Sequence, residues 1–207
     1  MDVLVAPPAR GRKPDPAKRR AILVAAQRLF LAQGYDVSLD AVAATAGVSK
    51  QTIYNLFGSK EDLFVATCED TVDRLTSALV APAPDLQPRD VLSQFGRTFL
   101  EFLLNEGAIR FKRILIPLAE QYPRLTAQYY RFGPGQSRKR LADYLAVETQ
   151  RGRLAVPDTM LGAEQFTGML IGHAQICALL AIPEETPIDI EARVASAVTA
   201  FLRAYAP

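Results

Sequence analysis

The chain has 207 residues, 49% of them hydrophobic, which allows one large or two modest globular domains with a real core. Residues 1–60 carry nine Lys or Arg against four Asp, a net charge of +5, whereas residues 61–207 carry fifteen basic against eighteen acidic residues, a net charge of −3. A basic first part on a mildly acidic body favours a phosphate-neutralising module joined to one that does not bind phosphate.

Several protein classes are disfavoured by short-range features. The apolar run at residues 3–6 is too short for a signal sequence, so we expect a cytoplasmic protein. Residues 165–183 carry no formal charge but include polar side chains that are costly in hydrocarbon, so we expect a packed helix and no membrane span. Cys68 and Cys177 are far apart in the sequence, which predicts free buried thiols, with a redox switch as the alternative.

The chain begins with a predicted flexible basic arm, residues 1–14. Its Arg10 and Arg12 could enter a minor groove or lie along a DNA backbone, and the alternative is a disordered tail. A first helix is predicted from Asp15, as its N-cap, to Gly34. The basic run on its early turns could also reach DNA, or could be a solvated face.

Residues 38–57 have the pattern of two short helices joined by a tight turn. Ser38 can cap the first helix, whose apolar residues recur at i, i+3, i+4 and i+7. Gly47 can adopt the left-handed conformation of a helix C-terminus, and Ser49 can then cap the second helix. This pattern predicts a helix-turn-helix.

The second short helix has a face that suits DNA. At about 100° per residue, its large apolar residues fall on one side and its polar residues on the other. The polar side consists of Lys50, Gln51, Tyr54 and Asn55. Such groups pair with phosphates and base edges in a major groove, and the alternative is an ordinary solvated face. Ser59 and Asp62 indicate a new helix start, which places Lys60 beside the same face.

Three segments of this region form a signature. They read Gly34-Tyr35, Ala46-Gly47-Val48-Ser49-Lys50 and Ile53-Tyr54-Asn55-Leu56-Phe57-Gly58-Ser59-Lys60-Glu61-Asp62-Leu63-Phe64. The signature resembles the N-terminal domain of the tetracycline-repressor (TetR) family of bacterial transcription regulators and covers about the first third of the chain. The resemblance implies a helix-turn-helix domain at residues 15–62. It implies DNA contacts by Ser49, Lys50, Gln51, Tyr54, Asn55 and Lys60.

Residues 60–80 are predicted to form a single helix, which Pro82 ends. This helix leads into the predicted body, residues 63–207. The body has no strand alternation or hairpin signal, so we expect an all-α fold. Its predicted helices span residues 88–105, 108–121, 124–132, 135–152, 158–181 and 187–205. Pro117 should kink the second of these.

Aromatic residues of the body suggest a ligand pocket. They recur at helical spacing, which an ordinary packed core also produces. The family resemblance favours a cavity, because the body of these proteins commonly holds a ligand. The predicted ligand is a small hydrophobic effector, and the candidate residues are Phe95, Phe99, Phe102, Arg110, Tyr129, Tyr130, Met169 and His173. For His173, a core or interface position and a metal-ligand role are further alternatives.

The last two helices resemble the family's dimer interface, a four-helix bundle made by two-fold symmetry. The candidate interface residues are Phe166, Leu170, Val194, Val198 and Phe201. No catalytic constellation, Gly-rich phosphate loop or metal-ligand cluster is evident in the sequence, so we expect neither enzyme activity nor a metal or cofactor.

These features together predict a homodimeric regulator. We expect a repressor that binds a near-palindromic operator in double-stranded DNA and releases it when a small hydrophobic effector occupies the body. Two alternatives remain open. One is an architectural DNA-binding protein without an effector, and the other is a scaffold whose helical body binds protein and whose DNA-binding head is vestigial.

Overall fold

The computed structural model describes residues 15–80, 82, 85–183 and 188–207, and over these residues the regular elements are all helical. In chain order they are α1 (Pro16–Gln33), α2 (Leu39–Ala46), α3 (Lys50–Phe57), α4 (Lys60–Leu75), η1 (Ser77–Leu79), α5 (Pro88–Leu103), α6 (Glu106–Leu115), η2 (Ile116–Leu118), α7 (Pro123–Phe132), α8 (Pro134–Gln150), α9 (Thr159–Ile171), α10 (Ala174–Leu180) and α11 (Ile190–Ala204). The all-α prediction is confirmed. Arg10 and Arg12 lie outside the described residues.

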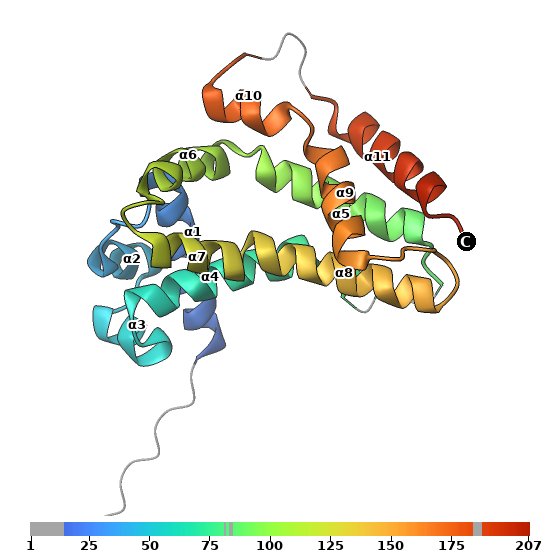
Figure 1. Cartoon of the computed structure of the whole chain (residues 1–207). Coiled ribbons are helices and arrows are strands. Elements are labelled where there is room, and N and C mark those ends of the chain that lie inside the picture. Colours follow the sequence, from blue (N-terminus) through green and yellow to red (C-terminus); the bar gives the residue numbers. More distant parts are fainter. Residues whose placement is uncertain (1–14, 81, 83–84, 184–187) are drawn as a thin grey trace, which may run out of the picture.

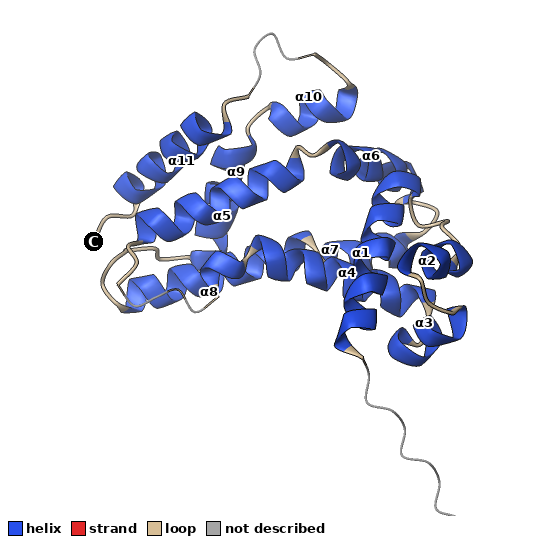
Figure 2. Cartoon of the chain, turned by 180° about the vertical axis from the view of Figure 1, so that it is seen from behind, coloured by secondary structure: helices blue, strands red, loops and turns tan. Residues whose placement is uncertain are grey.

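The molecule has a head at one end and the C-terminus at the other. Helices α1, α2 and α3 form the head, and α4, α5 and α8 lie between it and α11 (Figure 1). The view from behind shows the same order (Figure 2). The head is therefore far from the last helix of its own chain.

The helix starts and stops of the head follow the predicted signals. Asp15 accepts a hydrogen bond from the backbone N–H of Ala17 at 3.0 Å, and Ser38 accepts one from Ala41 at 3.1 Å. Gly47 ends α2 in the left-handed conformation, with φ +66°. These caps satisfy N–H groups that a helix start leaves free.

Gly34 ends α1 where the head meets α6. Its φ is +78°, and a Cβ atom at this position would lie 2.7 Å from Cγ2 of Ile114. Real Cβ atoms do not approach another carbon so closely, so another residue here would displace the Ile114 side chain, and the positive φ also favours glycine.

The predicted linking helix is shorter than expected. α4 ends at Leu75, and η1 follows it as a tighter 3₁₀ turn. The Thr76 hydroxyl donates to the carbonyl of Val72 at 2.7 Å and accepts from Arg140 of α8 at 2.9 Å. A hydroxyl that bonds the preceding turn competes with the regular helix, which accounts for the early end.

Two helices of the body that were predicted to be continuous are interrupted in the structure. Pro117 does not kink α6; the α-helix ends at Leu115 and Pro117 lies in η2, because proline has no N–H to donate. The predicted helix at residues 158–181 is broken at Gly172, whose φ of +48° interrupts it between α9 and α10. Arg193 of α11 donates to the freed carbonyl of Ile171 at 2.8 Å.

The described residues have two hydrophobic cores. The head core contains the buried residues of α1, α2 and α3, with Leu63 and Phe64 of α4 and Phe111 of α6. The body core joins η1, α5, α8, α9 and α11. The predicted domain boundary at residue 62 falls inside α4, and α6 packs on the head although it follows α5 in the chain.

Cys68 and Cys177 are free, and both are half-buried. Burial raises the pKa of the Cys68 thiol to about 12, so this thiol is protonated at neutral pH. Across the described residues, none of the helices combines the length and apolar character that crossing a membrane requires.

The packing of the body core can be tested at Phe201 of α11, because its side chain is 0% exposed. Phe201→Ala should lower the free energy of unfolding by about 3–5 kcal/mol, since it removes a buried ring and leaves a cavity. Urea denaturation at one fixed protein concentration measures the effect. Arg203→Ala, an exposed position on the same helix, should change stability by less than about 0.5 kcal/mol. Equal effects of the two changes would contradict the assigned packing.

Candidate nucleic-acid interface

α3 lies on the outside of the head and is held by one apolar side. Ile53 is buried in the head core, and Leu56 and Phe57 are half-buried against it. On the opposite side Tyr54 keeps 42% of its surface exposed. The predicted division of this helix into a packing side and an outward side is confirmed.

The outward amides are held in place before any ligand is present. Gln51 Nε2 donates to Asn55 Oδ1, one turn further on, at 2.9 Å. The Ser49 hydroxyl caps the helix by accepting from the backbone N–H of Thr52 at 3.2 Å. Side chains that are already ordered lose less conformational entropy when they bind a ligand.

Lys50 is paired within the head. Its Nζ lies 2.9 Å from Asp40 Oδ2 of α2, and both side chains are exposed. The hydrogen bond to Asp40 raises the pKa of Lys50. Asp40 was not among the predicted site residues, because it is ten positions away in the sequence and only the turn between α2 and α3 brings it beside Lys50. A phosphate must therefore compete with Asp40 for this lysine.

Lys60 lies at the start of α4, beside α3. Its Nζ is 4.6 Å from the ring centroid of Tyr35, and burial lowers the pKa of this lysine. Ser59 caps α4 by accepting from the N–H of Asp62 at 3.0 Å and donates to the Asp62 carboxylate at 2.6 Å. Lys60 is therefore more enclosed than an ordinary surface lysine, with the aromatic ring of Tyr35 as its support.

The basic run of α1 is divided between two uses. Arg20 pairs with Asp70 of α4 at 2.6 Å, which ties the head to the linking helix. The guanidinium carbon of Arg19 lies 5.3 Å from the ring centroid of Phe57, at the end of α3, and Arg19 is exposed. Arg19 thus adds a cation at the edge of the outward side.

Comparison with known proteins identifies the head and the body separately. Residues 22–67 match the family model of bacterial regulatory proteins of the tetR family. Residues 90–207, more than half of the chain, match the C-terminal domain of AefR-like transcriptional repressors. The chain belongs to the TetR family of transcriptional regulators. The resemblance expected from the sequence is confirmed, and with it the assignment of the head as a DNA-binding domain.

Two curated relatives of this TetR-family regulator match it over only part of their length. The regulator BetI from Rhizobium meliloti is 38% identical over 85 residues, which cover 40% of this chain and 42% of BetI. The activator FasR from Mycolicibacterium smegmatis is 38% identical over 69 residues, 33% of this chain and 32% of FasR. The chain thus spans less than half the length of each of these two curated relatives.

Solved structures align along almost the whole chain. A TetR-family regulator from Mesorhizobium loti is 28% identical with a TM-score of 0.74, and the alignment covers 93% of this chain and 98% of that one. The flavonoid-responsive regulator FrrA is 30% identical with a TM-score of 0.67, covering 93% and 99%. Head and body therefore follow the family arrangement together.

The structure does not gather the predicted ligand residues of this TetR-family regulator around one cavity. Phe95 is fully buried in the body core and stacks on Phe99 at 5.4 Å, while Tyr129 packs on Phe111 at 5.4 Å in the head core. Phe102 is half-buried, and the exposed candidates are Arg110, Tyr130, Met169 and His173. The alternative of ordinary core packing holds for the buried rings, and the single-pocket prediction is corrected.

The predicted interface side chains are also corrected. They are Phe166, Leu170, Val194, Val198 and Phe201, and all are buried within the single chain. Helical spacing identified them as apolar stripes, but α9 and α11 use these stripes to pack on each other and on α5. Such side chains stabilise one protomer and have no surface left for a partner.

Asp40→Asn should strengthen binding to duplex DNA of any sequence, because it leaves Lys50 without its carboxylate partner. The salt dependence, as the slope of log K against log salt concentration, should become steeper by up to about one unit. Fluorescence anisotropy at several salt concentrations measures both effects. Asp143→Asn is the matched control, because Lys139 and Asp143 form a similarly exposed pair with the same 2.9 Å separation on α8. Identical shifts in both variants would show that Lys50 is not a phosphate contact.

Proposed function

We propose that this chain is a homodimeric, cytoplasmic, sequence-specific repressor that leaves its operator when a small hydrophobic effector binds its body. The proposal rests on the outward side of α3. There, hydrogen-bonded amide side chains and a tyrosine hydroxyl lie next to basic side chains, on a helix whose N-terminus is capped. Gln51 and Asn55 would read bases, whereas Tyr54 and Lys60 would bind phosphates. Ser49 and Lys50 would complete the contacts, and Arg10 and Arg12 of the arm would add to them.

The dimer proposed here uses a different surface from the buried stripes. Large exposed apolar side chains are concentrated in residues 160–182, and they are Met160, Leu161, Met169, Ile176, Leu180 and Ile182. Leu180 alone keeps 63% of its surface exposed. Apolar surface of this kind, on and next to α9 and α10 and outside the helices α1–α3 of the head, supports an isologous contact between two copies (Figure 1).

α4 is placed to carry an effector signal to the head. At its head side, Asp70 binds Arg20 and Thr71 accepts from Gln27 Nε2 at 2.9 Å. At its other end, Asp73 lies 2.5 Å from the guanidinium of Arg140 in α8. An effector that shifts α8 would move α4 and the head with it. To change the bound population from 1:99 to 99:1, it must prefer the released state by about 10⁴-fold.

The names of similar proteins support both halves of the proposal. The match of the body to AefR-like repressors favours repression, although FasR is described as an activator. FrrA is described as flavonoid-responsive, which favours a ring-containing effector. The packed rings around Phe95 favour the second candidate, an architectural DNA-binding protein without an effector. Reporter transcription with and without candidate effectors separates the two functions.

Gln51→Ala should change which bases are preferred, whereas Tyr54→Phe should weaken binding to all sequences alike. The lost base contact should cost about 1–3 kcal/mol at its position. Selection from a pool of randomised duplexes measures the preference, and the parent should select near-palindromes with half-site centres about 34–36 Å apart or a multiple of it. Gln150→Ala, at an exposed position of α8, is the control. An unchanged profile for Gln51→Ala, or no sequence preference in the parent, would refute the proposed readout.

Leu180→Glu should convert the dimer to a monomer, because a carboxylate without a partner would be buried at the contact. Sedimentation velocity measures the mass in solution. Val24→Glu on α1 is the matched control, since Val24 is also an exposed apolar side chain and lies on the head. A dimer that survives both Leu180→Glu and Leu161→Glu would remove residues 160–182 from the interface.

A further inference from the structure

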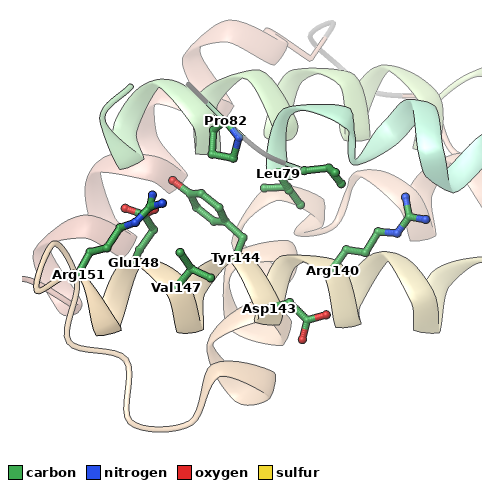
Figure 3. A pocket seen from close by; sticks show the side chains of 9 residues that line it. Leu79, Pro82, Arg140, Asp143, Tyr144, Val147, Glu148 and Arg151 are labelled. Atoms are coloured by element: carbon green, nitrogen blue, oxygen red, sulfur yellow. The ribbon is translucent and has the colours of Figure 1, made fainter. Parts of the chain in front are cut away.

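A cavity of about 370 Å³ lies between α8 and residues Leu79, Val80 and Pro82 after α4, and none of the residues that the sequence suggested as a pocket lines it. One wall is a single face of α8, with lining residues spaced three or four apart from Arg140 to Arg151. Leu79 and Pro82 face it from the other side (Figure 3). With Val147, these two give the cavity apolar walls, while its ends are polar.

Tyr144 gives the first indication that the cavity binds a ligand. Its side chain belongs to the body core and is only 4% exposed, yet its hydroxyl has no hydrogen-bond partner among the described residues. Figure 3 shows this hydroxyl at the end of the cavity where Glu148 and Arg151 lie. A buried hydroxyl without a partner is unfavourable, and a ligand that supplies the partner is bound more tightly for it.

Glu148 is the second sign. It is 0% exposed, and its Oε1 accepts from Arg151 at 3.1 Å and from Arg153 at 2.8 Å. Its Oε2 lies 2.5 Å from Arg153 Nε but accepts no hydrogen bond of good geometry. Oε2 is therefore ion-paired with Arg153 but accepts no hydrogen bond from any described group. Burial, and then the charge of Glu148, raise the pKa of Tyr144, so its hydroxyl keeps its proton.

We propose that this cavity is the effector site and takes a neutral, mostly apolar ring compound with a phenolic hydroxyl. The hydroxyl donates to Glu148 and accepts from Tyr144, which satisfies both groups at once. A carboxylate in the same place meets the charge of Glu148, and an ammonium meets the two arginines that already surround it. The assignment as an effector site rests on the proposed function, whereas the binding chemistry stands on the cavity alone.

The site has a direct connection to α4. Arg140 lines the cavity, and its guanidinium also binds Asp73 and the Thr76 hydroxyl at the end of that helix. A ligand that packs against Arg140 changes the position of a group that holds α4 to α8. The coupling between effector and head is therefore carried by a named ion pair and hydrogen bond.

The test is calorimetric titration of the full chain, without DNA, with 4-phenylphenol, its methyl ether 4-methoxybiphenyl and biphenyl-4-carboxylate. The parent should bind the phenol most tightly. Tyr144→Phe should weaken phenol binding by about five- to tenfold, as expected for one lost hydrogen bond, and should leave the melting temperature unchanged or higher because no partner is lost. Val147→Trp, at an exposed position of the wall, should block binding by filling the space. Tyr130→Phe, an exposed tyrosine of α7, should bind as the parent does.

The proposal is overturned if the parent does not bind 4-phenylphenol, if it prefers the ether or the carboxylate, or if Tyr144→Phe and Val147→Trp bind the phenol as tightly as the parent does. Addition of the phenol to the protein–DNA complex then tests the regulatory role separately. Binding that depends on Tyr144 but does not change DNA affinity would keep the site and reject its role as effector site. If the parent protein did not bind DNA in a sequence-specific way, the proposed function would be rejected instead.

Discussion

The aromatic cluster around Phe64 determines how the rest of the molecule can move. Phe64 belongs to α4, and its ring lies 5.3 Å from Phe30, 5.3 Å from Tyr35 and 6.2 Å from Phe111 of α6. Close-packed rings of this kind resist independent displacement. The head, the first half of α4 and α6 therefore form one mechanical unit. The boundary between rigid parts lies further along the chain, between Phe64 of α4 in the head core and Leu79 of η1 in the body core.

That boundary clarifies the role of polar contacts on α4. Arg20 and Gln27 attach it to the head, whereas Arg140 attaches its other end to α8. Surface ion pairs of this type contribute little to stability and can be exchanged at low cost. Contacts that are weak individually but well placed suit a switch, because a ligand of ordinary affinity can change them without disrupting either core.

Local signals in the sequence were enough to predict the head, and non-local packing explains why the body was less predictable. Ser38, Gly47 and Ser49 act within one turn of their own position, so their capping roles could be read directly. The stripes that include Phe201 were correctly apolar, but periodicity alone does not say whether a stripe meets its own chain or a partner. The Asp40 contact with Lys50 and the Tyr144 cavity depend on which elements become neighbours, and no local pattern records that.

Gly34 has a consequence for modular exchange among relatives. Domains that meet through side chains can be recombined if the new side chains repack, because rotamers adjust. Here the end of α1 meets Ile114 at a point where there is no room for even a methyl group. In a chimaera that joins this body to the head of another protein, the residue at the position of Gly34 must also fit against Ile114. Compatibility between heads and bodies therefore depends in part on the contact between the Gly34 backbone and the Ile114 side chain, which lies outside both α3 and the cavity beside α8.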